Sequence, residues 1–163
     1  MAAESTTYEK ECLTGKKKEL EALPELIDFF KTDLKPIEDR YSRFDLKGKN
    51  VFVEIKSREL LHAAYPTTIV GANKAKAAKK LVAKGCKVYF CFKFIDGLYY
   101  YEYDEKMFDD VREFKRHARS GWEDKPVEYC FIPITDLKLI KKYQVKAKRE
   151  KCVRLSNGLI QCV

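Results

Sequence analysis

The sequence lacks the features that would indicate a secreted, membrane-spanning or zinc-stabilised protein. Its N-terminus has no apolar run after a positive stretch, so we expect no secretory signal. No window approaches the roughly 18–20 apolar residues of a membrane span. The six cysteines are scattered without a CxxC pair, and the only histidines are His62 and His117. This pattern argues against structural zinc and favours a reducing, intracellular compartment.

Two kinds of catalytic motif are also missing. The sequence contains no glycine-rich phosphate loop, and neither histidine has an evident nucleophile partner. The sequence therefore indicates neither ATP use nor acyl transfer.

The composition is typical of one folded domain with a basic surface. A chain of 163 residues can bury a sizeable core, and 45% of its residues are hydrophobic. Ten tyrosines and ten phenylalanines favour a sheet-rich interior. The formal net charge of +8 suggests a polyanionic partner such as nucleic acid.

Hydrophobic spacing and turn signals predict a mixed α/β domain over residues 16–143, after a loosely ordered segment 1–15 and before a basic tail 144–163. A proline inside a helix is unfavourable, so Pro24 could break the first predicted helix. We expect Gly85 to cap the end of the second predicted helix and Asp96-Gly97 to form a hairpin turn. Residues 65–68 are expected to form a loop. The helices are predicted over about 16–30, 73–84, 106–118 and 135–143, and the strands over about 41–47, 51–57, 87–94, 98–103 and 127–132.

A hairpin is also predicted in the tail around Ser156-Asn157-Gly158. A three-residue loop would place Cys152 opposite Cys162, whereas a two-residue loop would offset them diagonally. Opposed cysteines can approach disulfide geometry, but a reducing compartment favours free thiols.

The stretch RFDLKGKNVFVEIKSR places charged residues on a predicted hairpin. Alternation puts Phe44 and Leu46 on one face of the first strand and Arg43 and Asp45 on the other. The second strand divides in the same way, with Val51, Val53 and Ile55 on one face and Phe52, Glu54 and Lys56 on the other.

The turn length decides how the two strands align. With two or four residues around Gly48-Lys49, Leu46 would face Val51 and Asp45 would be a diagonal neighbour of Glu54. Diagonal pairs lie roughly 7–8 Å apart, within reach of a shared cation. A change of one residue in the turn would alter this register.

The charged face of the hairpin can be interpreted in two ways. Asp45 and Glu54 supply hard oxygen ligands of the kind that Mg²⁺ prefers, and Lys56 could orient a water or stabilise charge on a phosphate. The same alternation also fits the solvated face of an ordinary hairpin.

The order of elements, together with Asp45 and Glu54-Ile55-Lys56, resembles the PD-(D/E)XK nuclease superfamily, which includes restriction enzymes, recombination exonucleases and Holliday-junction resolvases. The resemblance covers about residues 16–132 and looks closest to small stand-alone nucleases of large DNA viruses and phages. It implies a restriction-endonuclease-like α/β core, a central mixed β-sheet flanked by helices. This sequence departs from the superfamily pattern by having Phe44, not proline, before the aspartate.

The resemblance also implies a function: a Mg²⁺- or Mn²⁺-dependent DNA endonuclease, acting in repair or recombination inside the host cell of a virus. Junction resolvases of the superfamily act as dimers, so a homodimer is one expected arrangement. The alternative is a non-catalytic, basic nucleic-acid-binding protein on the same fold. The intact Asp45, Glu54 and Lys56 favour the enzyme.

By the same resemblance, the backbone carbonyl of Ile55 joins Asp45 and Glu54 as a metal ligand. Many members add an upstream glutamate, and we slightly favour Glu25 or Glu38 over the other candidates, Glu19 and Glu21.

Basic residues near the motif are candidates for binding the nucleic-acid backbone. Lys76, Lys80 and Lys84 recur at i, i+4 spacing and predict either a phosphate-facing stripe or a solvated helix face. Lys74 is the leading candidate implied by the resemblance. Arg43 and Arg58 flank the hairpin and could hold phosphates or pair with acidic neighbours.

Overall fold

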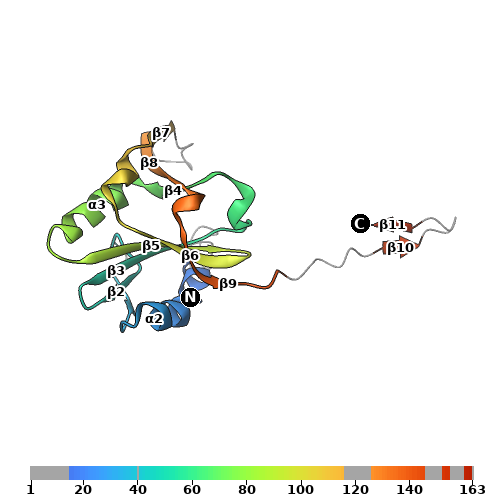
Figure 1. The fold of residues 1–163 in the computed structure, drawn as a ribbon, viewed down its shortest axis with the longest axis horizontal. Helices are drawn as coiled ribbons and strands as arrows, with labels where there is room; N and C mark the ends of the chain where they lie inside the picture. Colours follow the sequence, from blue (N-terminus) through green and yellow to red (C-terminus); the bar gives the residue numbers. More distant parts are fainter. Residues whose placement is uncertain (1–14, 40, 116–125, 146–151, 155–159, 163) are drawn as a thin grey trace, which may run out of the picture.

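The computed structural model describes residues 15–39, 41–115, 126–145, 152–154 and 160–162. Its main body is built on a six-stranded sheet with the order β1-β2-β3-β5-β6-β9 (Figure 1). β3 and β5 are parallel, and the other neighbours are antiparallel, so the sheet is mixed. These strands are β1 (Lys35–Pro36), β2 (Leu46–Gly48), β3 (Val51–Ser57), β5 (Lys87–Phe94), β6 (Gly97–Glu102) and β9 (Lys138–Lys142).

A smaller antiparallel sheet, with the order β4-β8-β7, lies on one side of the central sheet. Figure 1 shows helix α3 (Ala72–Val82) on that same side and helix α2 (Leu23–Phe30) on the opposite side. A central mixed sheet flanked by helices confirms the predicted fold class. The strands of the smaller sheet are β4 (Thr67–Gly71), β7 (Val111–Lys115) and β8 (Pro126–Pro133).

The central sheet is covered by a hydrophobic core on each face. On the α3 side, Phe90 and Phe92 pack with Ala75 and Ala78. On the α2 side, Leu26 packs with a second set of strand residues, Val53, Ile55, Cys91 and Leu98. Strand β5 contributes to both cores, which explains why its sequence, KVYFCFKF, is almost continuously apolar.

Two predicted helical features are confirmed. The first helix is interrupted ahead of Pro24: residues 15–20 are helical, a turn follows at 21–22, and α2 begins at Leu23. Proline is tolerated in that first turn because its missing N–H would be unpaired there. The alanine-rich α3 is followed by Gly85, whose φ of 85° is the left-handed conformation that glycine adopts easily.

Two predicted helices are wrong. The segment expected to be helical over 106–118 forms a 3₁₀ turn, Glu105–Phe108, and then strand β7. The segment 135–143 forms a 3₁₀ turn, Ile134–Asp136, and then β9. Both strands lie at sheet edges: β7 pairs with the next strand, β8, and β9 pairs with β6, which is distant in sequence. Tertiary pairing therefore overrode weak local signals.

Three boundaries also differ from expectation. Thr67 and Thr68, expected in a loop, belong to β4, and Gly97 is the first residue of β6 rather than part of the turn. The strand expected over 41–47 begins only at Leu46, as β2. Ahead of it, the Ser42 hydroxyl binds the backbone of Phe44 in place of a sheet partner. Its oxygen donates to the Phe44 carbonyl (2.8 Å) and accepts from the Phe44 amide (3.2 Å).

The tail contains a two-stranded sheet of β10 (Cys152–Arg154) and β11 (Ile160–Cys162). Its register pairs Cys152 with Cys162, as the three-residue loop predicts. Side chains from residue 146 onwards and residues 1–14 lie outside the described residues, and Gly15, expected at the end of a loose segment 1–15, is helical.

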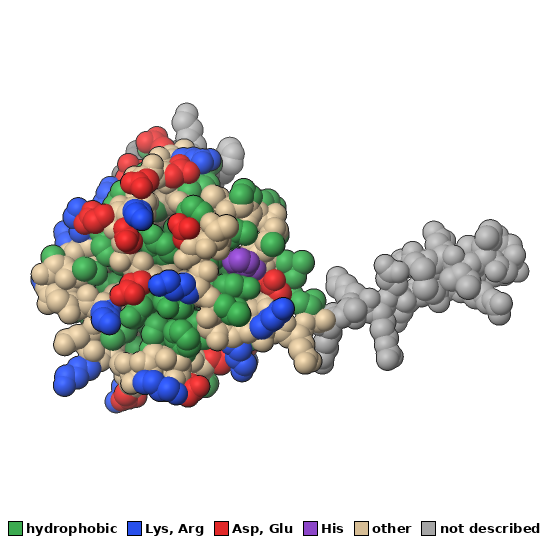
Figure 2. Space-filling view, viewed as in Figure 1, with side chains coloured by type: hydrophobic (Ala, Val, Ile, Leu, Met, Phe, Trp, Pro, Cys, Tyr) green, Lys and Arg blue, Asp and Glu red, His purple; other side chains and the backbone are tan. Residues whose placement is uncertain are grey.

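Acidic and basic side chains are interspersed on the face shown in Figure 2, with hydrophobic side chains exposed between them. In the part of the chain that the structure describes, no helix has the length and apolar character needed to cross a membrane.

Candidate active site

The hairpin of β2 and β3 closes with a two-residue loop, Lys49-Asn50, in which Asn50 adopts a φ of 56°. The observed register pairs Leu46 with Val53, so the expectation that Leu46 faces Val51 is wrong. Val51 instead faces Gly48. The register ends at the Leu46–Val53 pair, and Asp45, which was expected to be a diagonal neighbour of Glu54, instead directs its carboxylate to the amide of Ile55, the residue after Glu54.

Asp45 lies just before β2, and its backbone is held from two sides. Its N–H donates to the Val53 carbonyl (3.0 Å), and its carbonyl accepts from the Ile37 amide (2.8 Å). The Oδ2 atom of Asp45 then accepts a hydrogen bond of 2.8 Å from the Ile55 amide. The carboxylate thus replaces the strand partner that β2 does not provide beyond the Leu46–Val53 pair.

The two strands do not share faces in the expected way. Phe44 packs in the core on the α3 side, with its ring 5.8 Å from that of Phe52, whereas Leu46 packs on the α2 side. The expectation that Phe44 and Leu46 share a face is therefore wrong, because Phe44 precedes the regular strand. In β3 the predicted alternation is confirmed, with Val53 and Ile55 on the α2 side.

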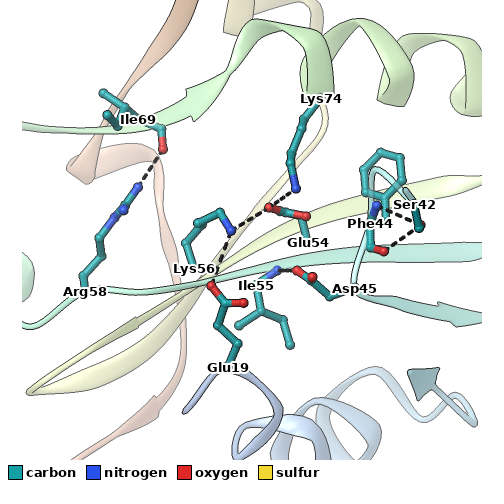
Figure 3. Close-up of polar contacts among 10 residues, drawn as sticks. All are labelled: Glu19, Ser42, Phe44, Asp45, Glu54, Ile55, Lys56, Arg58, Ile69 and Lys74. Atoms are coloured by element: carbon teal, nitrogen blue, oxygen red, sulfur yellow. Dashed lines mark hydrogen bonds and ion pairs between the residues drawn. The ribbon is translucent and has the colours of Figure 1, made fainter. Parts of the chain in front are cut away.

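Glu54 is the most deeply buried charged residue of the site, with 1% of its side chain exposed. Its Oε1 atom contacts the Lys56 ammonium at 2.9 Å and also accepts a hydrogen bond from Lys74 of α3 (Figure 3). Its Oε2 atom is buried and has no hydrogen-bond partner among the described residues. One oxygen of this carboxylate is therefore shared by two cations while the other is left unpaired.

Lys56 links this carboxylate to the first helix. Its Nζ atom lies 3.3 Å from Oε1 of Glu19, which comes from the helical residues 15–20 (Figure 3). Glu19 is the upstream glutamate that the structure brings to the motif. The two preferred candidates lie elsewhere: Glu25 contacts Lys141 (2.8 Å) and the Tyr143 hydroxyl (2.6 Å), and Glu38 is exposed.

Two of the predicted DNA-binding residues lie beside the motif, and the other four do not contact it within the described chain. Lys74 reaches Glu54, and the Arg58 guanidinium donates to the Ile69 carbonyl (2.9 Å), so both lie beside the motif. Lys76 forms an ion pair with Glu128 (2.8 Å). The remaining candidates, Arg43, Lys80 and Lys84, are exposed.

Comparison with protein families agrees with this geometry. A family model described as "Phage putative PDDEXK endonuclease" matches residues 4–140, which include the Glu19 helix, the hairpin and α3. The chain belongs to this PD-(D/E)XK endonuclease family. Comparisons with curated proteins and with solved structures returned no match.

Burial shifts the pKa values of charged side chains at this site. Burial raises the pKa of Glu54 to about 7; the nearby Asp45 adds to this rise, and Lys56 and Lys74 oppose it. Burial also raises the pKa of Glu19. Burial alone would lower the pKa of Lys56, but the carboxylates of Glu54 and Glu19 outweigh it and the net shift is upward.

The donor set of the endonuclease fits a hard divalent cation. Asp45 and Glu54 supply carboxylate oxygens, and the unpaired Oε2 of Glu54 is a buried acceptor that lacks a donor within the described chain. The N–H and C=O of one strand residue point to the same edge, so the Ile55 carbonyl faces the side on which Asp45 binds the Ile55 amide. Magnesium commonly binds one or two carboxylates and completes its shell with water. Within the described ranges, no three His, Cys, Asp or Glu side chains are already gathered into a metal-binding cluster.

The raised pKa of Glu54 predicts a pH-dependent stability. The folded protein holds this proton more tightly than the unfolded chain, so the free energy of unfolding should fall as the pH rises from 4.5 towards 7. The loss due to Glu54 should reach about 3 kcal/mol. Urea unfolding in EDTA gives the free energy of unfolding of the wild type and of Glu54→Gln at several values between about pH 5 and about pH 8. The loss is measured as the change with pH in the difference between these two free energies. A difference that stays constant over this range would contradict the raised pKa.

Proposed function

We propose that the protein is a divalent-metal-dependent endonuclease that hydrolyses phosphodiester bonds in DNA. The observation that carries this proposal is the cluster of Asp45, Glu54 and Lys56 around the Ile55 peptide, with one buried oxygen of Glu54 that has no partner among the described residues. Membership of the PD-(D/E)XK family supports the same assignment. In an infected host cell, such an activity would serve the repair or recombination of DNA.

Asp45, Glu54 and the Ile55 carbonyl would hold a Mg²⁺ or Mn²⁺ ion, which when bound supplies positive charge at the phosphate and a more acidic water. The chain's own residues prepare this site by keeping the carboxylates close. Glu54 sits between two ammonium groups, and their charge offsets the cost of burying it beside Asp45.

Lys56 is the group best placed to act on the reacting atoms. Because Glu19 holds its Nζ at 3.3 Å, Lys56 keeps an anchor even when Glu54 turns to another cation. It remains a cation at neutral pH, since the neighbouring carboxylates raise its pKa. Lys56 can therefore hold a water in place by hydrogen bonding or stabilise negative charge on the phosphate.

Lys74 and Arg58 are the proposed phosphate contacts nearest to the cluster. Lys74 approaches Glu54 from α3, and Arg58 continues the line of β3 beyond Lys56. Two exposed lysines, Lys80 in α3 and Lys84 just after it, would extend the contact with the DNA backbone.

Replacing either carboxylate should abolish cleavage. We expect Asp45→Asn and Glu54→Gln each to lower the cleavage rate of plasmid DNA in Mg²⁺ or Mn²⁺ at least about 100-fold, because loss of metal binding removes several kcal/mol of charge stabilisation. EDTA should stop cleavage by the wild type.

Glu38→Gln is the matched control, because Glu38 is exposed and outside the cluster. It should cleave at the wild-type rate. If folded Glu54→Gln cut DNA as fast as the wild type, the site assignment would be wrong. If the wild type bound DNA without cutting it in either metal, the non-catalytic binding protein would replace the enzyme.

The lysines in and just after α3 should differ in their contribution to DNA affinity. Removing an exposed phosphate contact lowers the slope of log affinity against log salt by about 0.9 for duplex DNA. We therefore expect Lys80→Gln and Lys84→Gln each to lower the slope by about that amount, and Lys76→Gln to lower it less, because Glu128 already pairs with Lys76. Fluorescence anisotropy over a salt series measures the slope. Equal slopes for the wild type and Lys80→Gln/Lys84→Gln would mean that these lysines are only solvated.

A further inference from the structure

A cavity of about 360 Å³ lies beyond the end of β3. Its walls come from the segment that follows β3, from β4 and from the end of β5, and we call it the Arg58 cavity after the charged residue in its lining. Leu60, Phe94 and Ile134 in this lining also pack against the core on the α3 side. The cavity therefore opens on the same side of the central sheet as Glu54, which Lys74 of α3 contacts.

Flat rings line much of the Arg58 cavity. Tyr65 is 63% exposed, whereas Phe94 is 3% exposed. His62 is fixed by its neighbours: its ring stacks on Tyr99 with centroids 4.0 Å apart and meets Phe94 edge-on at 5.3 Å. Phe131 is the remaining aromatic residue of the lining. The Arg112 guanidinium lies 4.3 Å from the centroid of the Phe131 ring. An exposed ring and held rings in one lining offer surfaces onto which another flat ring can stack.

Few polar side chains share this lining. Thr67 and Thr68 of β4 belong to it. Arg58 uses Nη2 to bind the Ile69 carbonyl, and a guanidinium has five N–H donors, so other donors remain for a ligand. Pockets that bind small flat ligands have this composition, mainly apolar with a few converging polar groups, in roughly 300–1,000 Å³.

The Arg58 cavity adjoins the catalytic strand. Lys56 and Arg58 are two residues apart, which corresponds to about 7 Å along an extended chain and places their side chains on one face. Figure 3 shows Arg58 just beyond the end of β3, the strand that carries Lys56, with its side chain turned towards Ile69. A DNA strand with a phosphate at Lys56 would therefore bring its next nucleotide to the mouth of the cavity.

We propose that the Arg58 cavity receives an unpaired nucleobase next to the phosphate that is cut, so that the protein favours DNA with an unpaired nucleotide at that place. Aromatic rings stack on any base, and a base inside a duplex is already stacked and cannot enter a cavity. Arg58 supplies the positive charge for the adjoining phosphate. This inference rests on the proposed function for the position of the phosphate.

The test measures DNA binding without metal, so that it does not depend on cleavage. Fluorescence anisotropy in EDTA compares three labelled duplexes of one sequence: fully paired, with one unpaired central nucleotide, and with an abasic nucleotide in its place. Stacking of one base predicts roughly 5- to 150-fold tighter binding of the unpaired duplex by the wild type. The abasic duplex should lose this gain, because the base and not the flexibility of the backbone is recognised.

Three variants assign the gain to the cavity. Tyr65→Ala should abolish the preference for the unpaired duplex and leave affinity for the paired duplex unchanged. Tyr65→Phe keeps the ring and should keep the preference. Tyr41→Ala is the matched control, since Tyr41 is 87% exposed and is not part of the cavity lining.

Several results would overturn the inference. They are equal wild-type affinity for paired and unpaired duplexes, an equal gain with the abasic duplex, or a preference that survives in Tyr65→Ala. Light scattering of the free protein tests whether the cavity is instead filled by a second copy of the chain. If Tyr65→Ala turned a dimer into a monomer without changing DNA binding, the cavity would be a dimer contact. A base preference in a protein that cuts no DNA would contradict only the proposed function, and cutting without a base preference would contradict only the cavity.

Discussion

The buried carboxylate of Glu54 is the constraint on which the rest of the site depends. With 1% of its side chain exposed, it needs compensating charge, and Lys56 from its own strand and Lys74 from α3 supply it. Removing one partner of a buried pair typically costs about 3–5 kcal/mol, so the same contacts that define the site also fasten α3 to the central sheet. Lys56 extends the network to Glu19 and thereby to the first helix.

This network also explains how buried carboxylates can lie near one another in the protein. Burial raises the pKa of Glu54 and of Glu19, and the negative charge of Asp45 acts in the same direction on both. The two lysines hold the negative charge of these carboxylates in place. In the proposed function, the same charge balance would let Glu54 hold a divalent cation and leave Lys56 and Lys74 free to face a phosphate.

Much of this arrangement could be predicted from the sequence, because strong periodicity marks the central elements. Strands β3 and β5, the alanine-rich α3 with Gly85 after it, and the grouping of Asp45, Glu54 and Lys56 follow from local patterns. Register does not, since one residue of turn length changes every pair. Glu19 and Glu25 have different partners, Lys56 for Glu19 and Lys141 for Glu25, and local patterns do not place the strands of these partners beside the helices. The edge strands β7 and β9 form only by pairing with another strand, β8 for β7 and the distant β6 for β9.

The most direct test of the account is a crystal of the wild-type protein soaked in MnCl₂ and measured for anomalous scattering from manganese. The account predicts a manganese peak coordinated by Asp45, Glu54 and the Ile55 carbonyl, with at least one of Lys56 and Lys74 displaced from Glu54. Manganese bound only at other places, with both lysines still in contact with Glu54, would contradict it.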